Sequence, residues 1–144
     1  MIFISKAIKR IIGILILAGV LIIAFHVYTL CMLFPGMDFS RLHAGIASWY
    51  SEKDPAINKR TANNEIFDDE ADTCATWHYS FHEKLLVFNL LNGKWTLCRV
   101  NDRGPAKRLN REVDLTKAAF EKIASSRKGL IPVVVVPINK RSSK

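Results

Sequence analysis

The central part of this chain lacks an excess of charge of either sign. The whole sequence has 21 Lys and Arg residues against 13 Asp and Glu residues, a formal net charge of +8. Most of the excess lies in a basic leader, at Lys6, Lys9 and Arg10, and in a basic tail, so residues 43–139 are nearly balanced. Because a nucleic-acid-binding domain usually concentrates positive charge within its fold, we expect no nucleic acid partner.

Cysteine is scarce as well. Cys31, Cys74 and Cys98 are far apart in the sequence, so no pair has the spacing of a zinc site. His78 and His82 are four residues apart, but no Glu or Cys stands at a recognised ligand spacing from them. We therefore expect neither a metal nor a cofactor. Two interpretations stay open for Cys74 and Cys98: free buried thiols, or a disulfide formed in an oxidising compartment.

A convincing cleavage site is missing after the one long apolar run. Residues 11–25 carry no charge, and the apolar character continues to Phe34. Because about 20 residues cross a bilayer, the sequence predicts an uncleaved signal anchor, a transmembrane helix within residues 1–34. A cleaved signal peptide or a lipid-modified Cys31 would need small residues that are absent from the flank. The basic leader then predicts a domain on the extracytoplasmic side of the membrane.

Internal repeats and low-complexity segments are also absent. Residues 35–43 read as a linker, residues 44–139 as one domain and residues 140–144 as the basic tail. Apolar patterns predict strands at 45–50 and 130–138, a hairpin at 84–100 around Asn92-Gly93, and a helix at 116–125. Residues 113–116 read as a strand or a helix cap, 66–67 as a brief strand or turn, and 71–82 as a helical turn or loop. Five or six short strands with one helix predict a mainly β fold that closes into a small barrel.

An acid and a base stand together where one predicted strand stops. Asp102 and Arg103 follow Val100, and Gly104-Pro105 then turns the backbone, which keeps both side chains out of a strand interior. Glu65 lies upstream in a polar stretch. Two carboxylates on loops of one small barrel predict acid/base chemistry. The alternative is an Asp102–Arg103 ion pair that only pins the turn.

Five sequence blocks in order carry a resemblance to a known family. They are Gly45-Ile-Ala-Ser-Trp-Tyr50, Thr61-Ala-Asn-Asn-Glu65, Asn89-Leu-Leu-Asn-Gly93, Arg99-Val-Asn-Asp-Arg-Gly-Pro105 and Val113-Asp-Leu-Thr116. Together they resemble the rare lipoprotein A (RlpA-like) family, from about Gly45 to Ile138. The resemblance implies a six-stranded double-psi β-barrel with one short helix. It also implies lytic transglycosylase activity on peptidoglycan glycan strands, with a preference for strands that lack stem peptides.

The resemblance places the family's two carboxylates on Glu65 and Asp102. The family's histidine falls on Thr76 here, with His78 two residues further on, and Asn64 replaces a glycine before Glu65. Candidate substrate contacts are Thr76, His78, Arg103, Asn101, Tyr50, Tyr79 and Asn63. Among the aromatic residues, Tyr50 and Tyr79 are expected in a groove, and Trp49 and Trp95 in the core.

The expected reaction needs one carboxyl group that protonates the glycosidic oxygen and then accepts a proton. We assign that role to Asp102 and charge stabilisation to Glu65, and the reverse assignment is open. The expected partners are peptidoglycan and, through the anchor, the membrane; cell-division or envelope proteins are further candidates. A noncatalytic glycan-binding or expansin-like wall-loosening module is the rival interpretation, because the family histidine is missing.

Overall fold

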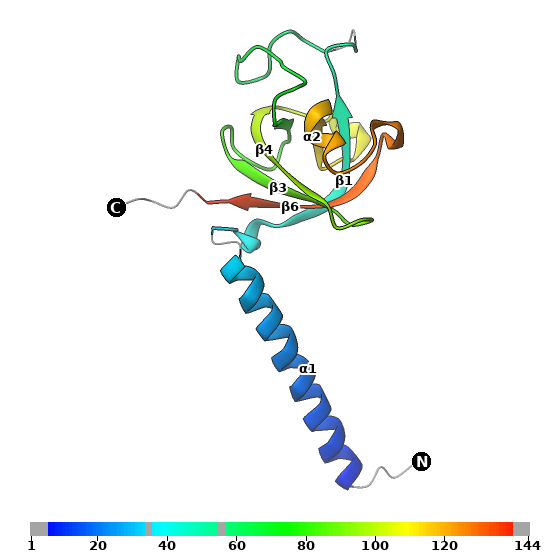
Figure 1. Ribbon diagram of the computed structural model, residues 1–144. Helices are drawn as coiled ribbons and strands as arrows, with labels where there is room; N and C mark the ends of the chain where they lie inside the picture. The colour runs from blue at the N-terminus through cyan, green and yellow to red at the C-terminus, as the bar shows by residue number, and fades with distance from the viewer. Residues whose placement is uncertain (1–5, 34–35, 55–56, 140–144) are drawn as a thin grey trace, which may run out of the picture. The chain divides into compact units, whose positions relative to one another are not determined.

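The structure is a computed structural model that describes residues 6–33, 36–54 and 57–139. The chain divides into two units, residues 1–36 and residues 37–144. The first unit contains helix α1 (Lys6–Leu33), drawn in blue in Figure 1. Within the described residues, no helix combines the length and the apolar character that crossing a membrane requires. The predicted transmembrane helix is therefore not found.

The second unit is a closed six-stranded barrel (Figure 1). Its strands are β1 (His43–Tyr50), β2 (Thr73–Ala75), β3 (Lys84–Asn89), β4 (Trp95–Asp102), β5 (Val113–Thr116) and β6 (Ile131–Ile138). They close in the order β1-β5-β2-β4-β3-β6, in which the β1–β5 and β2–β4 pairs are parallel and the others antiparallel. The mainly β barrel predicted from the sequence is confirmed.

Alternation of apolar residues explains how the strands fill the barrel. In β6, Val133 and Val135 are fully buried, and in β3 Leu85 and Val87 are buried in the same way. Side chains two residues apart share one face of a strand, so these positions converge on a common interior. The principal core cluster also contains Val100, Val113, Leu115, Phe120 and Ile123.

The predicted hairpin joins β3 to β4, with Leu85 opposite Cys98 and Phe88 opposite Trp95. The connection is longer than the expected two-residue turn, since β3 ends at Asn89 and β4 begins at Trp95. Within it, the Gly93 N–H donates to the Asn89 carbonyl at 2.9 Å. Gly93 has a φ of 70°, which glycine adopts without strain. Asn89 and Asn92 each donate a side-chain N–H to the Ile123 carbonyl at 2.9 Å. These bonds tie the turn to the segment after α2.

Several expected boundaries shift in the structure. Residues 73–75 form β2, where a helical turn or loop was expected, because the Cys74 and Ala75 backbones pair with strands on both sides. Residues 113–116 are strand β5, and α2 (Lys117–Glu121) is shorter than the predicted helix. The barrel unit begins at Met37 and β1 at His43, within the expected linker.

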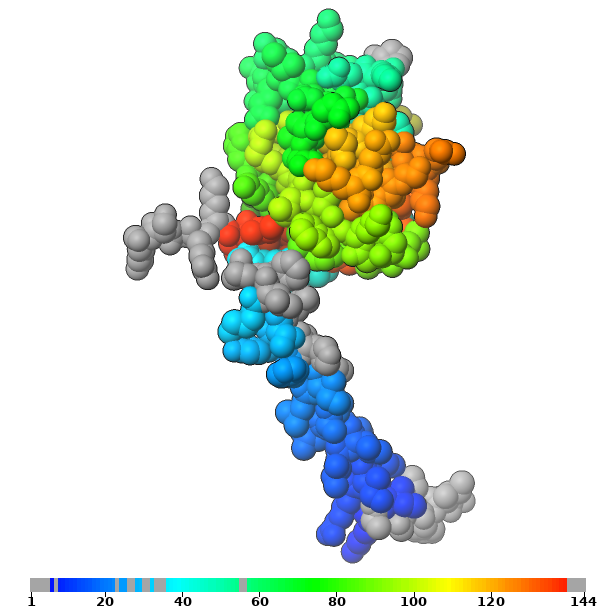
Figure 2. Space-filling view, in the orientation of Figure 1, coloured from blue at the N-terminus to red at the C-terminus, as the bar shows by residue number. Residues whose placement is uncertain are grey.

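Two further contacts hold the barrel unit together, one of them between buried residues of the core. Cys74 of β2 and Cys98 of β4 form a disulfide with a Cα–Cα distance of 5.8 Å. The Ala118 N–H at the start of α2 donates to the Asp69 carbonyl at 3.0 Å. Figure 2 shows the loop before β2, in green, lying against the yellow and orange segment that contains α2. The long loop between β1 and β2 is thereby fixed at its second end.

Candidate active site

One row of residues crosses four neighbouring strands of the barrel. Ser48 of β1 pairs with Asp114 of β5, Asp114 pairs with Ala75 of β2, and Ala75 pairs with Asp102 of β4. Neighbouring strands lie about 4.8 Å apart, so the two aspartate Cα atoms are about 10 Å apart with only the small Ala75 between them. The fold thus brings two carboxyl groups that are separate in sequence onto one face.

A bulge in β4 sets the direction of the Asp102 side chain. Cys74 pairs with Val100, whereas the next residue, Ala75, pairs with Asp102, so Asn101 is an additional residue in β4. Such bulges bend a strand and redirect the side chains beside it. Asn101 consequently points away from the row and donates to a Glu65 carboxylate oxygen at 3.1 Å.

Asp102 lies in an open pocket of about 460 Å³, which it lines together with Ala62 and Arg103. Its Oδ1 atom accepts hydrogen bonds from the Ala62 and Arg103 backbone N–H groups, both at 2.8 Å. These two bonds fix the carboxyl group between the end of β4 and the loop that carries Glu65. Asp102 is therefore placed at the end of its strand, as predicted, and is oriented toward a space that a ligand can enter.

Asp114 is the more enclosed carboxyl group of the row. Its side chain is 18% exposed, and the Ser48 hydroxyl donates to its Oδ1 atom. Burial raises the pKa of Asp114 to about 6; the positive charge of Arg111 opposes this shift, and the negative charge of Asp102 adds to it. Asp114 can therefore hold a proton at a pH at which an exposed carboxyl group cannot.

Tyr50 lies on the same face as Ser48, two residues along β1, and is buried. Its ring stacks on Phe67 with 4.7 Å between centroids. Its hydroxyl is buried and has no hydrogen-bond partner among the described residues. Burial raises the pKa of Tyr50, and the negative charges of Asp102 and Asp114 raise it further. Phe67, in the loop after β1, covers the Tyr50 ring, although Tyr50 also lines an open pocket beside Trp49. A contact between Tyr50 and a substrate stays a prediction.

Glu65 is held by a set of fixed hydrogen bonds. Arg99 binds it with both guanidinium nitrogens, at 2.7 and 2.8 Å, and Asn63 donates at 2.8 Å. These bonds, Arg99 first, lower the pKa of Glu65 to about 2. Asn64 adopts a φ of 72°, the left-handed conformation that asparagine tolerates in place of the family's glycine. Glu65 is thus a permanent carboxylate near neutral pH.

Arg103 and Thr76 do not face the pocket with their functional groups. The Arg103 guanidinium donates to the Thr76 and Tyr79 carbonyls, each at 3.0 Å, and lies 3.8 Å over the Phe81 ring. Thr76 is fully buried, and its hydroxyl donates to the Glu112 carbonyl at 3.1 Å. Arg103 therefore fixes the loop after β2 and forms no ion pair with Asp102, and Thr76 cannot contact a substrate.

The remaining aromatic candidates are distributed differently from the prediction. Tyr79 is buried, with its hydroxyl 2.8 Å from the Arg41 carbonyl. Trp95, expected in the core, is 49% exposed, and so is Trp77. The Trp77 indole N–H donates to the Pro105 carbonyl at 2.7 Å, which holds the ring beside the turn that follows Asp102. His78 lies beside Glu112 and not in the Asp102 pocket.

Two residues of this site were not predicted from the sequence. Arg99 stands in β4 between Cys98 and Val100, where a charged residue signals a partner, but the distant Glu65 could not be identified as that partner. Asp114 was read as a strand end or a helix cap. Its single charge in the short strand Val113–Thr116 was the available signal.

Comparison with known proteins gives relatives of one kind. A Helicobacter pylori protein named endolytic peptidoglycan transglycosylase RlpA is 36% identical over 100 residues, which cover 69% of this chain and 31% of that protein. A Treponema pallidum protein named probable endolytic peptidoglycan transglycosylase RlpA is 46% identical over 76 residues, 52% of this chain and 23% of the relative. The chain thus spans about a third or less of the length of these curated relatives.

Solved structures share the barrel at low sequence identity. A Streptomyces papain inhibitor matches with a TM-score of 0.54 and 19% identity, over 69% of this chain and 94% of that one. A mutant Clavibacter michiganensis expansin in complex with cellohexaose matches with a TM-score of 0.53 and 18% identity, over 72% and 53% of the two chains. These matches concern the fold alone. The family model described as lytic transglycolase matches residues 42–135, and the chain therefore belongs to this RlpA-like family of double-psi β-barrel domains.

Proposed function

We propose that this protein is a lytic transglycosylase that cleaves the glycan strands of peptidoglycan. The observation that carries the proposal is the row in which Asp114 and Asp102 flank Ala75, with Asp102 at an open pocket. Two carboxyl groups on one face are the parts that cleavage of a glycosidic bond needs. Relatives at 36% and 46% identity bear the name endolytic peptidoglycan transglycosylase, which supports this substrate.

Asp102 is the acid and then the base of the proposed reaction. Its protonated carboxyl gives a proton to the glycosidic oxygen as the bond to the anomeric carbon breaks. The resulting carboxylate takes a proton from the C6 hydroxyl of the muramic acid residue, whose oxygen attacks the anomeric carbon. The products are a new chain end and a 1,6-anhydro ring, no water is consumed, and Asp102 regains its proton.

The other two carboxyl groups support this cycle in different ways. Asp114, across Ala75 from Asp102, has its pKa raised to about 6 by burial, so it is the carboxyl group of the row that can hold a proton near neutral pH. Glu65 has its pKa lowered to about 2 by Arg99, so it supplies a lasting negative charge. That charge suits the stabilisation of positive charge that develops on the sugar ring, so we assign the role of the acid to Asp102 and not to Glu65.

We place the domain outside the cytoplasm, in the bacterial cell envelope where peptidoglycan lies. The Cys74–Cys98 disulfide supports this location, because disulfides form and persist in oxidising compartments. The substrate form that we propose is the glycan strand without stem peptides. No contact within the described residues points to a particular cell-division or envelope protein as partner.

A noncatalytic glycan-binding module is the second candidate function. It is favoured by Thr76, which stands at the family's histidine position but is fully buried and hydrogen-bonded to the Glu112 carbonyl. No imidazole is then available at that position to act on a sugar. The exposed Trp77 ring, fixed beside the Pro105 carbonyl, is a surface on which a sugar ring could stack.

Product analysis separates the two functions. The purified full chain and its Asp102→Asn variant are incubated with stem-stripped glycan strands, and the soluble products are identified by mass. Cleavage predicts anhydro-ended fragments from the parent and their loss in the variant. A folded parent that sediments with peptidoglycan but releases no fragments would contradict the enzyme and favour the binding module.

A further inference from the structure

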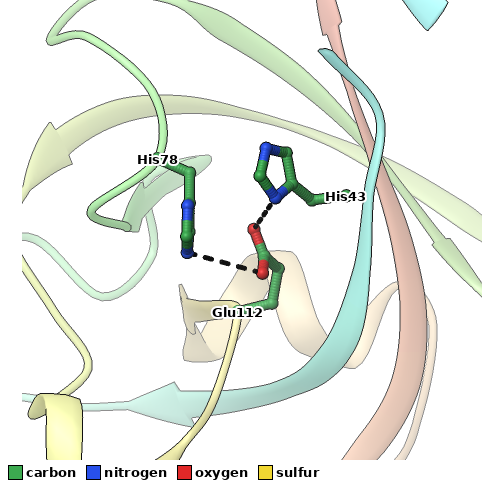
Figure 3. A group of neighbouring side chains, drawn as sticks. All are labelled: His43, His78 and Glu112. Atoms are coloured by element: carbon green, nitrogen blue, oxygen red, sulfur yellow. Dashed lines mark ion pairs between the residues drawn. The ribbon is translucent and has the colours of Figure 1, made fainter. Parts of the chain in front are cut away.

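Two histidines and a glutamate meet in a part of the barrel unit that the proposed reaction does not use. His43 opens β1, His78 lies between β2 and β3, and Glu112 immediately precedes β5. Figure 3 shows both imidazole rings turned toward the Glu112 carboxylate. His43 Nδ1 lies 3.7 Å from Glu112 Oε1, and His78 Nε2 lies 3.7 Å from Oε2. The three ligand atoms all lie within 4.8 Å of one another.

The backbone around Glu112 holds this carboxylate in place. The Glu112 N–H donates to the Ile46 carbonyl at 2.8 Å, and its own carbonyl accepts from the Thr76 hydroxyl at 3.1 Å. The same hydroxyl accepts from the His78 N–H at 3.3 Å, so Thr76 links two of the three residues. At Gly45, a Cβ atom would lie only 2.9 Å from the Glu112 Cβ. The glycine leaves the space that Glu112 occupies.

The Glu112 carboxylate lacks a hydrogen-bond donor for one of its oxygens within the described part of the protein. Its side chain is only 9% exposed, and in the described part of the chain its buried Oε1 atom has no hydrogen-bond partner. The imidazole nitrogens at 3.7 Å are too far away to donate a hydrogen bond. A buried carboxylate oxygen without a donor is costly, and buried charges are normally paired or coordinate a metal. A cation between the three residues would remove this cost.

The distances suit a single small ion. Zinc binds histidine nitrogen and carboxylate oxygen at about 2.0–2.2 Å in a tetrahedral arrangement, which places neighbouring donor atoms about 3.3 Å apart. The two 3.7 Å separations, one to each carboxylate oxygen of Glu112, exceed that value slightly. The His43 and His78 side chains are 39% and 45% exposed, so both rings have room to close on an ion. Two imidazoles and one carboxylate favour zinc over calcium or magnesium, which prefer oxygen ligands.

We propose that His43, His78 and Glu112 bind one divalent zinc ion, with the fourth coordination position open to solvent. The ion would join the start of β1, the loop after β2 and the segment before β5, which are far apart in the sequence. Metal that binds only the folded form stabilises it by mass action. The sequence could not predict this site, because the spacing of His43 and Glu112 from His78 follows no ligand motif. The inference is independent of the proposed glycan cleavage.

Zinc titration of the metal-stripped full chain tests the proposal. Calorimetry is expected to show one zinc ion bound, and Co²⁺ in place of zinc should give the visible absorption of a tetrahedral site. Loss of a residue that only hydrogen-bonds to a metal ligand typically lowers metal affinity by about 10–100-fold. His43→Ala and His78→Ala each remove a direct ligand, so each should weaken zinc binding by at least that factor. His82→Ala is the matched control, because His82 lies in the same loop but outside the cluster.

A Glu112→Gln variant could fail to fold, because the Glu112 side chain is buried. The two histidine variants test the site without it, because the His43 and His78 side chains are partly exposed. Folding of each variant is checked by circular dichroism. Unchanged zinc affinity in folded His43→Ala and His78→Ala proteins would overturn the proposal. An equal loss in the His82→Ala control would also overturn it. Neither result bears on glycan cleavage, which is measured separately by its products.

Discussion

At the scale of single residues, the proposed reaction depends most on Asp102. This carboxyl group lines the pocket, and the Ala62 and Arg103 backbone N–H groups donate hydrogen bonds to it. The amide oxygen of an asparagine at this position can accept the same two hydrogen bonds. We expect Asp102→Asn to lower the turnover of glycan strands by about 10²–10⁴-fold, the usual contribution of a general acid or base. Asp72→Asn is the control, because Asp72 is an exposed carboxylate paired with Lys122. Comparable losses in both variants would contradict the assignment.

Glu65 gives a second prediction at this scale, in the pH dependence of stability. Arg99 lowers its pKa from 4.5 to about 2 in the folded protein. A lowered pKa stabilises the fold above the unfolded value, and this contribution is lost as the pH falls from about 4.5 to about 2. Urea unfolding of the parent and of Glu65→Gln should therefore differ near neutral pH and converge near pH 2. A difference in the free energy of unfolding that stays constant over this pH range would show that the contribution of the Arg99–Glu65 contact does not depend on ionised Glu65.

At the scale of elements, the contact between β1 and the segment before β5 depends on the missing side chain of Gly45. Its replacement by alanine would place a Cβ atom 2.9 Å from the Glu112 Cβ, which backbone bonds to Ile46 hold in place. We expect Gly45→Ala to lower the free energy of unfolding by about 1–3 kcal/mol, as other overpacked sites do.

Thermal unfolding of Gly45→Ala and of the double variant with Glu112→Gly measures this effect. Removing the Glu112 side chain should restore part of the stability that the alanine costs, because the two substitutions act on one contact. Fully additive losses would mean that Gly45 matters for another reason.

Some of the strands could be predicted from the sequence and others could not. The valine-rich run at residues 130–138 and the turn at Gly93 predicted β6 and the β3–β4 hairpin, because their patterns are local. Strand β2 was missed because three residues are too few to show a period, and its pairing with β4 and β5 is set by distant segments.

The candidate site was predictable to a similar degree. Asp102 and Glu65 were found because the resemblance places the family's two carboxylates on them. Their partners Asp114 and Arg99 were not, since the strand order of the closed barrel decides which residues meet. Trp95 was misplaced because it lies at the exposed start of β4.

At the scale of the whole molecule, the disulfide is expected to contribute much of the stability of this small barrel. Cys74 and Cys98 are separated by 24 positions. Closing a loop of that length stabilises a fold by roughly 3–4 kcal/mol on the chain-entropy model. A reducing agent should therefore lower the urea midpoint of the parent and leave a Cys74→Ala, Cys98→Ala double variant unchanged. A midpoint that is insensitive to reductant in the parent would contradict a stabilising bridge.

The central claim concerns the molecule as a catalyst: a glycosidic bond is cleaved without water as the nucleophile. The most direct measurement is the mass of the products formed from stem-stripped glycan strands in water enriched in heavy oxygen. Attack by the C6 hydroxyl gives new anhydro ends, which are lighter by one water than a hydrolysis product and free of the label. Labelled reducing ends would contradict it by identifying a hydrolase, and the absence of any new ends from a folded protein would contradict catalysis itself.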